Sequence, residues 1–207
     1  IEAMGWAYQE VPRAAPGCLS TNACASGCPT GKKRGMSRAL WPTAREKGAR
    51  LVPRCRVHQL LFERHRCIGV LAEVEVEGGR RVLARIDADH VFVCAGPTET
   101  PALLRRSGVK FHVGETLRVH PMLKVAARFP ETIDAHQSVL PLLQVKEFWP
   151  DVSLGGAFFT PGHLALGLSD NWPETSDRMQ RFRNMASYYV AVRGEGRGWV
   201  RPSKLGD

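Results

Sequence analysis

A fully apolar run, Val91-Phe92-Val93-Cys94-Ala95, leads directly into Gly96 and narrows the possible folds more than any other part of the sequence. A strand that is apolar on both faces is typical of a parallel sheet covered by helices on both sides. Glycine reaches positive φ without steric strain, so it suits a tight turn at the end of such a strand. We therefore expect a buried strand at residues 91–95 that ends in a sharp turn.

Signals for a short helix follow this turn at once. Thr100 predicts an N-cap, Pro101 suits the first helical position, and Gly108 can end a helix over Ala102–Ser107. The unpaired amides and the dipole of a helix N-terminus favour negative charge, and Gly96 lets the backbone approach a ligand closely. The unit fits a phosphate-binding turn, and it equally fits an ordinary strand-to-helix turn without a ligand.

Three strand-like runs precede this unit and predict an antiparallel meander. They cover Leu51–Phe62, Ile68–Glu77 and Arg81–Ala88. The second run alternates apolar and polar residues toward its end, as expected for a strand with one face in water. The pair Gly78-Gly79 between the second and third runs is a hairpin signal.

The remaining elements are expected on both sides of this region. A helix is predicted over Ser37–Lys47, with Pro42 near its first turn or at a kink, and a second helix over Glu174–Ser187. Strands are predicted at Leu123–Phe129, Val139–Val145, Leu154–Phe159 and Tyr188–Arg193. We expect one domain over residues 1–117 and a second over 118–207.

The charge of the chain is strongly positive, with 29 Lys and Arg against 20 Asp and Glu and a net charge of +9. A basic nucleic-acid-binding module is therefore an alternative to consider. The basic residues lie in short dispersed clusters, such as Lys32-Lys33-Arg34 and Arg105-Arg106, which favours a solvated surface. No apolar run reaches the roughly 20 residues that cross a bilayer, so we expect no transmembrane segment.

Six cysteines occur, and three of them, Cys18, Cys24 and Cys28, lie close together near the start. Their spacing differs from the two-residue spacing of bacterial ferredoxin ligands, and zinc would need a second close pair. Reduced thiols are the first expectation, with a local disulfide as an alternative. A cysteine-based electron-transfer protein is a further alternative.

The run from Gly96 to Val109 resembles the second signature of the glucose-methanol-choline (GMC) oxidoreductase family. It reads Gly-Pro-Thr-Glu-Thr-Pro-Ala-Leu-Leu-Arg-Arg-Ser-Gly-Val, with Thr before Pro, a Leu pair and Ser-Gly at the family's spacing. Lys110 departs from the pattern, because the signature has Gly there.

Two flanking stretches are similar to the same family. Residues 113–121 match its Val-Gly-x-x-Leu-x-x-His-Pro run, and residues 27–33 are similar to a bacterial Gly-Cys-Pro-x-Gly-Ala-Lys segment. That branch includes sequences related to long-chain alcohol oxidases and cholesterol oxidases. The resemblance is strong over residues 17–130 and weak beyond.

The resemblance implies a mixed α/β chain: part of an FAD-binding Rossmann-like domain with an antiparallel meander, and part of an antiparallel-sheet substrate domain. It implies FAD as cofactor and a small-molecule alcohol as the substrate. The apolar residues Phe158, Phe159, Leu164, Leu166 and Leu168 hint at an apolar substrate, although residues of this kind more often belong to the core. Nucleic acid is not an expected partner. The cofactor contacts that it implies are Val57, Cys94, Ala95, Gly96 and His120.

Some family features are not found in this sequence. The strand with a Gly-x-Gly-x-x-Gly turn is missing, and the glycine-rich run at 194–198 does not precede a helix. None of the seven histidines has the context of a general base, so no catalytic residue is assigned. We expect the chain to be an internal piece of a longer enzyme, in which the Gly-x-Gly-x-x-Gly turn precedes it and the catalytic His follows it. No cellular compartment is assigned.

Overall fold

The computed structural model describes residues 1–24, 26–138 and 143–203. The chain divides into two compact units. The meander unit consists of Ala49–Val119 with the segment from Glu195 on, and the sheet unit consists of Ile1–Gly48 and His120–Gly194. One of the breaks, between Val119 and His120, lies beside the predicted boundary at 117/118, but neither unit is continuous in sequence.

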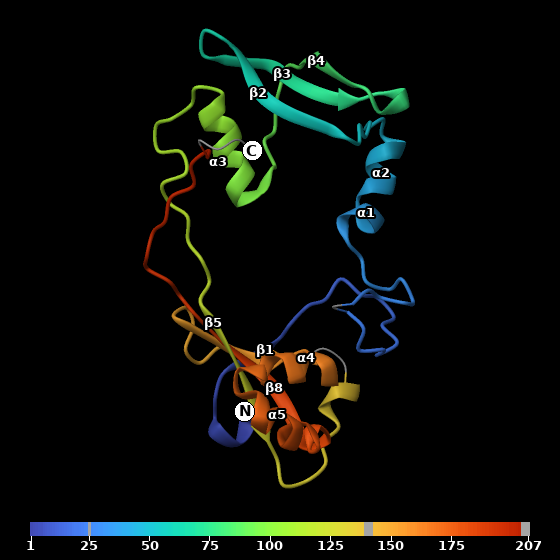
Figure 1. Ribbon diagram of the computed structural model, residues 1–207, viewed down its shortest axis with the longest axis vertical. Coiled ribbons are helices and arrows are strands. Elements are labelled where there is room, and N and C mark those ends of the chain that lie inside the picture. Colours follow the sequence, from blue (N-terminus) through green and yellow to red (C-terminus); the bar gives the residue numbers. More distant parts are fainter. Residues whose placement is uncertain (25, 139–142, 204–207) are drawn as a thin grey trace. The chain divides into compact units, whose positions relative to one another are not determined.

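The meander unit contains the predicted three-stranded antiparallel sheet (Figure 1). Its strands are β2 (Cys55–Glu63), β3 (Arg66–Glu75) and β4 (Arg81–Asp87), in the order β2-β3-β4. Gly78 and Gly79 form the turn between β3 and β4 with φ of 81° and 75°, values at which a side chain would be strained. The hairpin prediction is therefore confirmed.

Helix α3 (Gly96–Arg106) packs against β2 and completes this unit. The buried apolar residues of this unit are Leu60 on β2, Ala72 on β3, and Ala102 and Leu103 on α3. The Ser107 hydroxyl, just after α3, accepts a hydrogen bond from the Leu60 N–H over 2.8 Å. It donates to the Leu103 carbonyl over 2.7 Å. One hydroxyl thus ties the end of the helix to the strand.

The predicted buried strand at residues 91–95 is wrong. Residues 91–94 belong to no regular element, and the Phe92 side chain is 88% exposed. A strand that is apolar on both faces needs neighbouring strands and covering helices, and every strand pair among the described residues is antiparallel and lies elsewhere. The mixed α and β class with antiparallel sheets is confirmed, whereas a parallel Rossmann-like sheet is not seen in the described part.

The helix after the turn begins earlier than predicted. Thr100 and Pro101 were expected to start it, but α3 begins at Gly96, and Pro97 lies in its first turn. Proline suits this position because the first N–H groups of a helix have no intrahelical partner. Pro101 then lies inside the helix, where its missing N–H leaves the Pro97 carbonyl without its usual partner.

The sheet unit contains five antiparallel strands in the order β1-β6-β7-β8-β5 (Figure 1). They are β1 (Tyr8–Glu10), β5 (Met122–Arg128), β6 (Leu143–Val145), β7 (Val152–Ala157) and β8 (Met185–Val192). The predictions at Leu123–Phe129, Leu154–Phe159 and Tyr188–Arg193 are confirmed in outline. For Val139–Val145, residues 139–142 lie outside the described residues.

Helices α4 (Pro161–Gly167) and α5 (Trp172–Met179) lie on one face of this sheet. A core cluster of Phe159, Leu164 and Met185 lies there, with Met179 and Leu168 packed against it. The helix predicted over Glu174–Ser187 is wrong at its end, since residues 185–187 begin β8. This strand pairs with both β5 and β7, and such pairing overrides local preference.

The helix predicted over Ser37–Lys47 is present as two short pieces. They are α1 (Met36–Ala39) and α2 (Trp41–Glu46), joined at Leu40. Pro42 lies in the first turn of α2, the position where proline removes no intrahelical hydrogen bond. The predicted proline break is therefore confirmed.

Candidate functional site

A groove of about 370 Å³ lies at the N-terminus of α3 in the meander unit. Gly96 and Thr100 line it from the helix, and Gly114, Leu117 and Val200 line it from the segments alongside. Leu117 and Gly198 exchange backbone hydrogen bonds of 3.2 and 2.8 Å, and the Val200 N–H donates to the Gly114 carbonyl over 2.8 Å. The groove is thus framed by two paired segments and a helix start.

Gly96 leaves the helix end of this groove open. Its φ is +82°, and a Cβ built there would meet nothing within 4 Å. No side chain caps α3 by a hydrogen bond, so the first N–H groups of this 11-residue helix, apart from the one that Pro97 lacks, have no side-chain partner and can face an anion. The carboxylate of Glu99 in the first turn weakens anion binding there, because it is itself a negative charge near the positive end of the helix dipole.

The predicted cofactor contacts fall into both units. Cys94, Ala95 and Gly96 are exposed and adjacent at the start of α3. Val57 is half-buried on β2, the edge strand against which α3 packs, next to a register shift between Val57 and Gln59. His120 is exposed and is the first residue of the second segment of the sheet unit.

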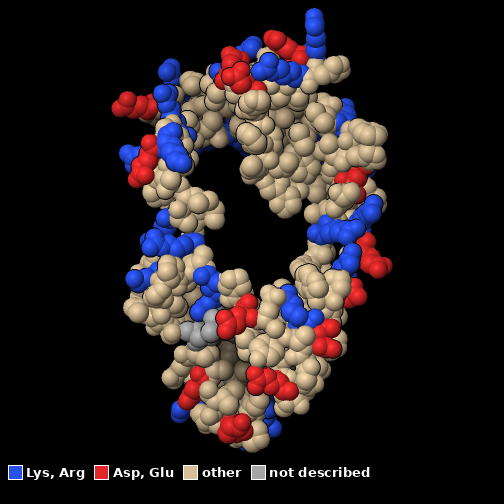
Figure 2. Space-filling view, turned by 180° about the vertical axis from the view of Figure 1, so that it is seen from behind, with Lys and Arg blue, Asp and Glu red and all other residues tan. Residues whose placement is uncertain are grey.

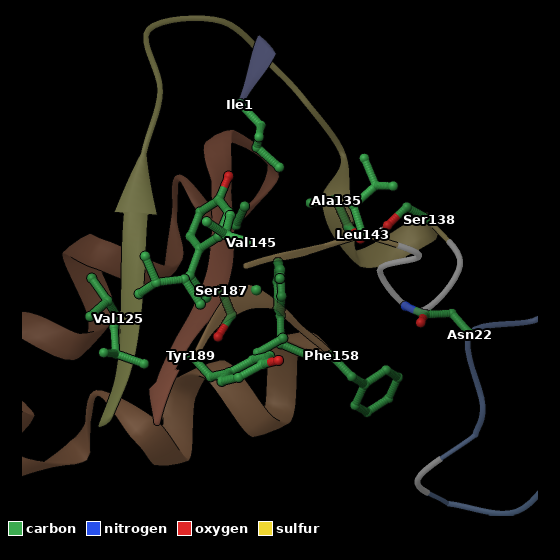
Figure 3. A pocket seen from close by; sticks show the side chains of 18 of the residues that line it. Ile1, Asn22, Val125, Ala135, Ser138, Leu143, Val145, Phe158, Ser187 and Tyr189 are labelled. Carbon is green, nitrogen blue, oxygen red and sulfur yellow. Dashed lines mark hydrogen bonds between the residues drawn. The ribbon is translucent and has the colours of Figure 1, made fainter. Parts of the chain in front are cut away.

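A larger cavity of about 690 Å³ lies in the sheet unit, mostly against apolar side chains (Figure 3). By strand register, one face of the sheet contributes Val125, Val145, Leu154, Tyr188 and Val190. Ser187 and Tyr189 also line it, and they alternate with these residues and so belong to the opposite face. The strand side chains that form its apolar wall therefore belong to one face of the sheet.

Sequence reasoning missed most of this cavity. Of the apolar residues singled out as a hint of a greasy substrate, Phe158 lines the cavity, while Phe159 and Leu164 form the core cluster and Leu166 is 74% exposed. The signal that could have found it is Gly155-Gly156 within a strand, since glycines there often mark close approach of another group.

The cysteine-rich segment presents free thiols. All six cysteines are free, and no group of three metal-ligating side chains is found among the residues that the structure describes. The Thr30 hydroxyl, 3.4 Å from the Cys28 sulfur, and then the Lys33 N–H, at 3.5 Å, lower the pKa of Cys28 to about 7. Cys28 is therefore the thiol that ionises near neutral pH.

The surface shows no separation of charge on the face in view. Figure 2 shows Lys and Arg interspersed with Asp and Glu there. Several charged side chains of the chain are paired, as in Arg54–Glu75 at 2.6 Å and the two-bond pair Arg183–Asp134. In the described part of the chain, no helix is long and apolar enough to span a membrane.

Comparisons with known proteins all point to one family. A sequence model described as GMC oxidoreductase matches residues 1–122. The GMC-type oxidoreductase y4nJ of Sinorhizobium fredii is 44% identical over 201 residues, which cover 97% of this chain and 40% of that protein. Long-chain-alcohol oxidase FAO1 of Arabidopsis thaliana is 27% identical over 226 residues, which cover 97% of this chain and 29% of that protein.

A solved structure shows a weaker likeness. Pyridoxine 4-oxidase from Mesorbium loti has a TM-score of 0.46 and 16% identity, and the match covers 72% of this chain and 32% of that chain. The chain thus spans less than half the length of the relatives it matches.

Proposed function

Because this chain belongs to the GMC oxidoreductase family, we propose that it forms part of an FAD-dependent enzyme that oxidises the CH–OH group of an alcohol to a carbonyl. The observation that carries this proposal is the groove at the start of α3. All of its lining residues except Val200 lie within the segment that matches the family, and its helix end is open at Gly96. Open backbone and free helix amides are what a phosphate-bearing cofactor requires.

The residues at this groove fit the dinucleotide. In the proposal, Cys94, Ala95 and Gly96 lie along the cofactor near its phosphates, where no Cβ at position 96 intervenes. The edge strand β2 offers the backbone of Val57 to the adenine, and His120 is a further contact. Residues 1–117 then supply flavin-domain material, including the Rossmann-like part, and residues 118–207 supply substrate-domain material.

The cavity of the sheet unit suits the substrate of such an enzyme. Its volume of about 690 Å³ lies within the roughly 300–1,000 Å³ of small-molecule sites. Its lining by valine, leucine and aromatic side chains excludes water and favours an apolar alcohol. The relatives named long-chain-alcohol oxidases support this choice of substrate class.

The chemistry divides between cofactor and protein. FAD, when bound, would accept the hydride from the alcohol carbon, while a base would take the hydroxyl proton and oxygen or another acceptor would reoxidise the flavin. The residues of this chain orient the alcohol in the cavity and keep water away from it. We assign no catalytic base among the residues of this chain.

The test is anaerobic reduction of the flavin in the purified natural gene product that contains this sequence. Long-chain alcohols should bleach the visible flavin absorption, and glucose or choline should bleach it far more slowly. Absence of bleaching with every alcohol offered would contradict the proposal.

A variant pair then tests whether the cavity is the substrate site. Val125→Asp introduces a charge into the apolar lining and should raise the KM for a long-chain alcohol more than tenfold, because the bound apolar chain would cover the carboxylate and remove it from water. Leu123→Asp, on the same strand but 71% exposed and outside the lining, is the matched control. Equal effects of both changes would place the substrate elsewhere.

A further inference from the structure

Tyr188 brings a polar group to the apolar wall of the cavity in the sheet unit. It pairs with Val125 on β5 and with Gly156 on β7, and directly paired residues of antiparallel strands lie on the same face of a sheet. All three residues line the cavity. The other strand residues of this face that line it are Leu143, Val145, Leu154, Ala186 and Val190. Among the described strand residues of this wall, Tyr188 is therefore the one with a polar side chain.

The hydroxyl of Tyr188 is available to a ligand. A phenol hydroxyl donates one hydrogen bond and also accepts. Within the described part of the chain it has no hydrogen-bond partner, and Tyr188 is 39% exposed. Water can satisfy this hydroxyl while the cavity is open, but an apolar molecule that fills the cavity displaces that water. The O–H then needs an acceptor from the ligand itself, because a buried donor without a partner is unfavourable.

The adjacent Tyr189 is arranged in the opposite way. Successive side chains of a strand point to opposite faces, so its side chain lies on the other face from that of Tyr188. There its hydroxyl accepts a hydrogen bond from Gln144 Nε2 over 3.0 Å, and the same amide also donates to the hydroxyl of Ser153, which is only 8% exposed. The Tyr189 hydroxyl is thus bound within the protein, and that of Tyr188 is not.

Two polar side chains that line the cavity from outside the sheet are also engaged. Asn22 donates from Nδ2 to the His136 carbonyl, and the Ser138 hydroxyl donates to the Ala135 carbonyl over 2.8 Å. Among the described residues on this side of the sheet, the Tyr188 hydroxyl is therefore the O–H donor of the lining that a ligand can use.

We propose that Tyr188 selects, among the apolar molecules that fit this cavity, those that carry an acceptor oxygen, by donating its hydroxyl proton to that oxygen. A long-chain alcohol and the carbonyl compound formed from it both belong to this class. The inference rests on the proposed function in taking this cavity as the substrate site (Figure 3). It goes further in naming the residue that recognises the oxygen of the substrate.

The test measures binding in the natural gene product with two molecules that are not alcohols. Hexyl methyl ether carries an acceptor oxygen, and chloroheptane has a similar size without one. Each is titrated as a competitor of the neutral apolar dye N-phenylnaphthylamine. Tyr188→Phe should weaken binding of the ether about two- to tenfold, the range of one neutral hydrogen bond, and leave binding of chloroheptane unchanged. Val125→Asp should weaken both, since both would lie against the apolar wall.

Tyr189→Phe is the matched control, because it removes a hydroxyl from the adjacent residue on the opposite face. It should leave the ratio of the two affinities unchanged. Failure of the wild-type protein to bind either molecule, equal losses for both in Tyr188→Phe, the same shift of the ratio in Tyr189→Phe, or no effect of Val125→Asp would overturn the inference. A selective loss in Tyr188→Phe in a protein that oxidises no alcohol would refute the proposed reaction and leave the inference standing.

Discussion

Replacing Ser107 with alanine tests how α3 is held to the meander. The change removes the hydroxyl that accepts the Leu60 N–H at 2.8 Å and donates to the Leu103 carbonyl at 2.7 Å. The Leu103 carbonyl keeps the Ser107 N–H as donor at 3.0 Å, so it loses little. Leu60 is only 4% exposed, and its N–H would be left without a partner.

The expected cost follows from that one orphaned donor. An unsatisfied buried polar group costs about 1–3 kcal/mol, which corresponds to an increase of about 5- to 150-fold in the exchange rate of a protected amide. We expect an increase in this range for the Leu60 amide in Ser107→Ala, measured by hydrogen exchange with mass spectrometry on the natural gene product. The urea midpoint should fall in parallel.

Ser169→Ala is the control for this experiment. Ser169 also donates to a carbonyl, that of Leu166 at 2.7 Å, but in an exposed hydrogen bond. Its loss should change stability by less than about 0.5 kcal/mol. If Ser107→Ala were no more disruptive than Ser169→Ala, the packing of α3 on β2 would not depend on this hydroxyl, and the reasoning would be refuted.

Two further predictions concern ionisation. Iodoacetamide should alkylate Cys28 at a rate that rises with pH through a midpoint near pH 7, and Thr30→Val should move that midpoint upward. A midpoint at the ordinary thiol pKa of about 8.5 in the unaltered protein would contradict the hydrogen bonds described. The hydrogen bonds from Arg183 hold the pKa of Asp134 below its usual range. The pair therefore stabilises the fold at pH values above the ordinary carboxyl pKa of about 4, and this stabilisation is lost as the pH falls through the lowered pKa of the folded state. Asp134→Asn should therefore reduce the loss of stability on acidification, and an unchanged pH profile of urea midpoints would argue against it.

Local signals predicted the local structure well. The glycines at 78–79 set the hairpin, and Pro42 set the break between α1 and α2, because each acts through the backbone of its own neighbourhood. The residues around Gly96 also predicted a glycine turn and a helix, although α3 starts five residues before Pro101, the predicted first helical position.

Features that depend on distant partners were not predictable in this way. Residues 91–95 are apolar enough for a buried strand, but a strand also needs neighbours, and the pattern of one segment does not reveal whether they are present. The cavity draws Val145, Leu154 and Val190 from three strands. Their meeting depends on the strand order β6-β7-β8, which periodicity does not encode.

The measurement that bears most directly on the account is the cofactor content of the natural gene product. The protein, purified and then denatured, should release FAD in a ratio of about one per chain, identified by its absorption and mass. Protein that carries no flavin, and that takes up none when FAD is added before purification, would contradict the assignment of the groove at Gly96 to a flavin dinucleotide.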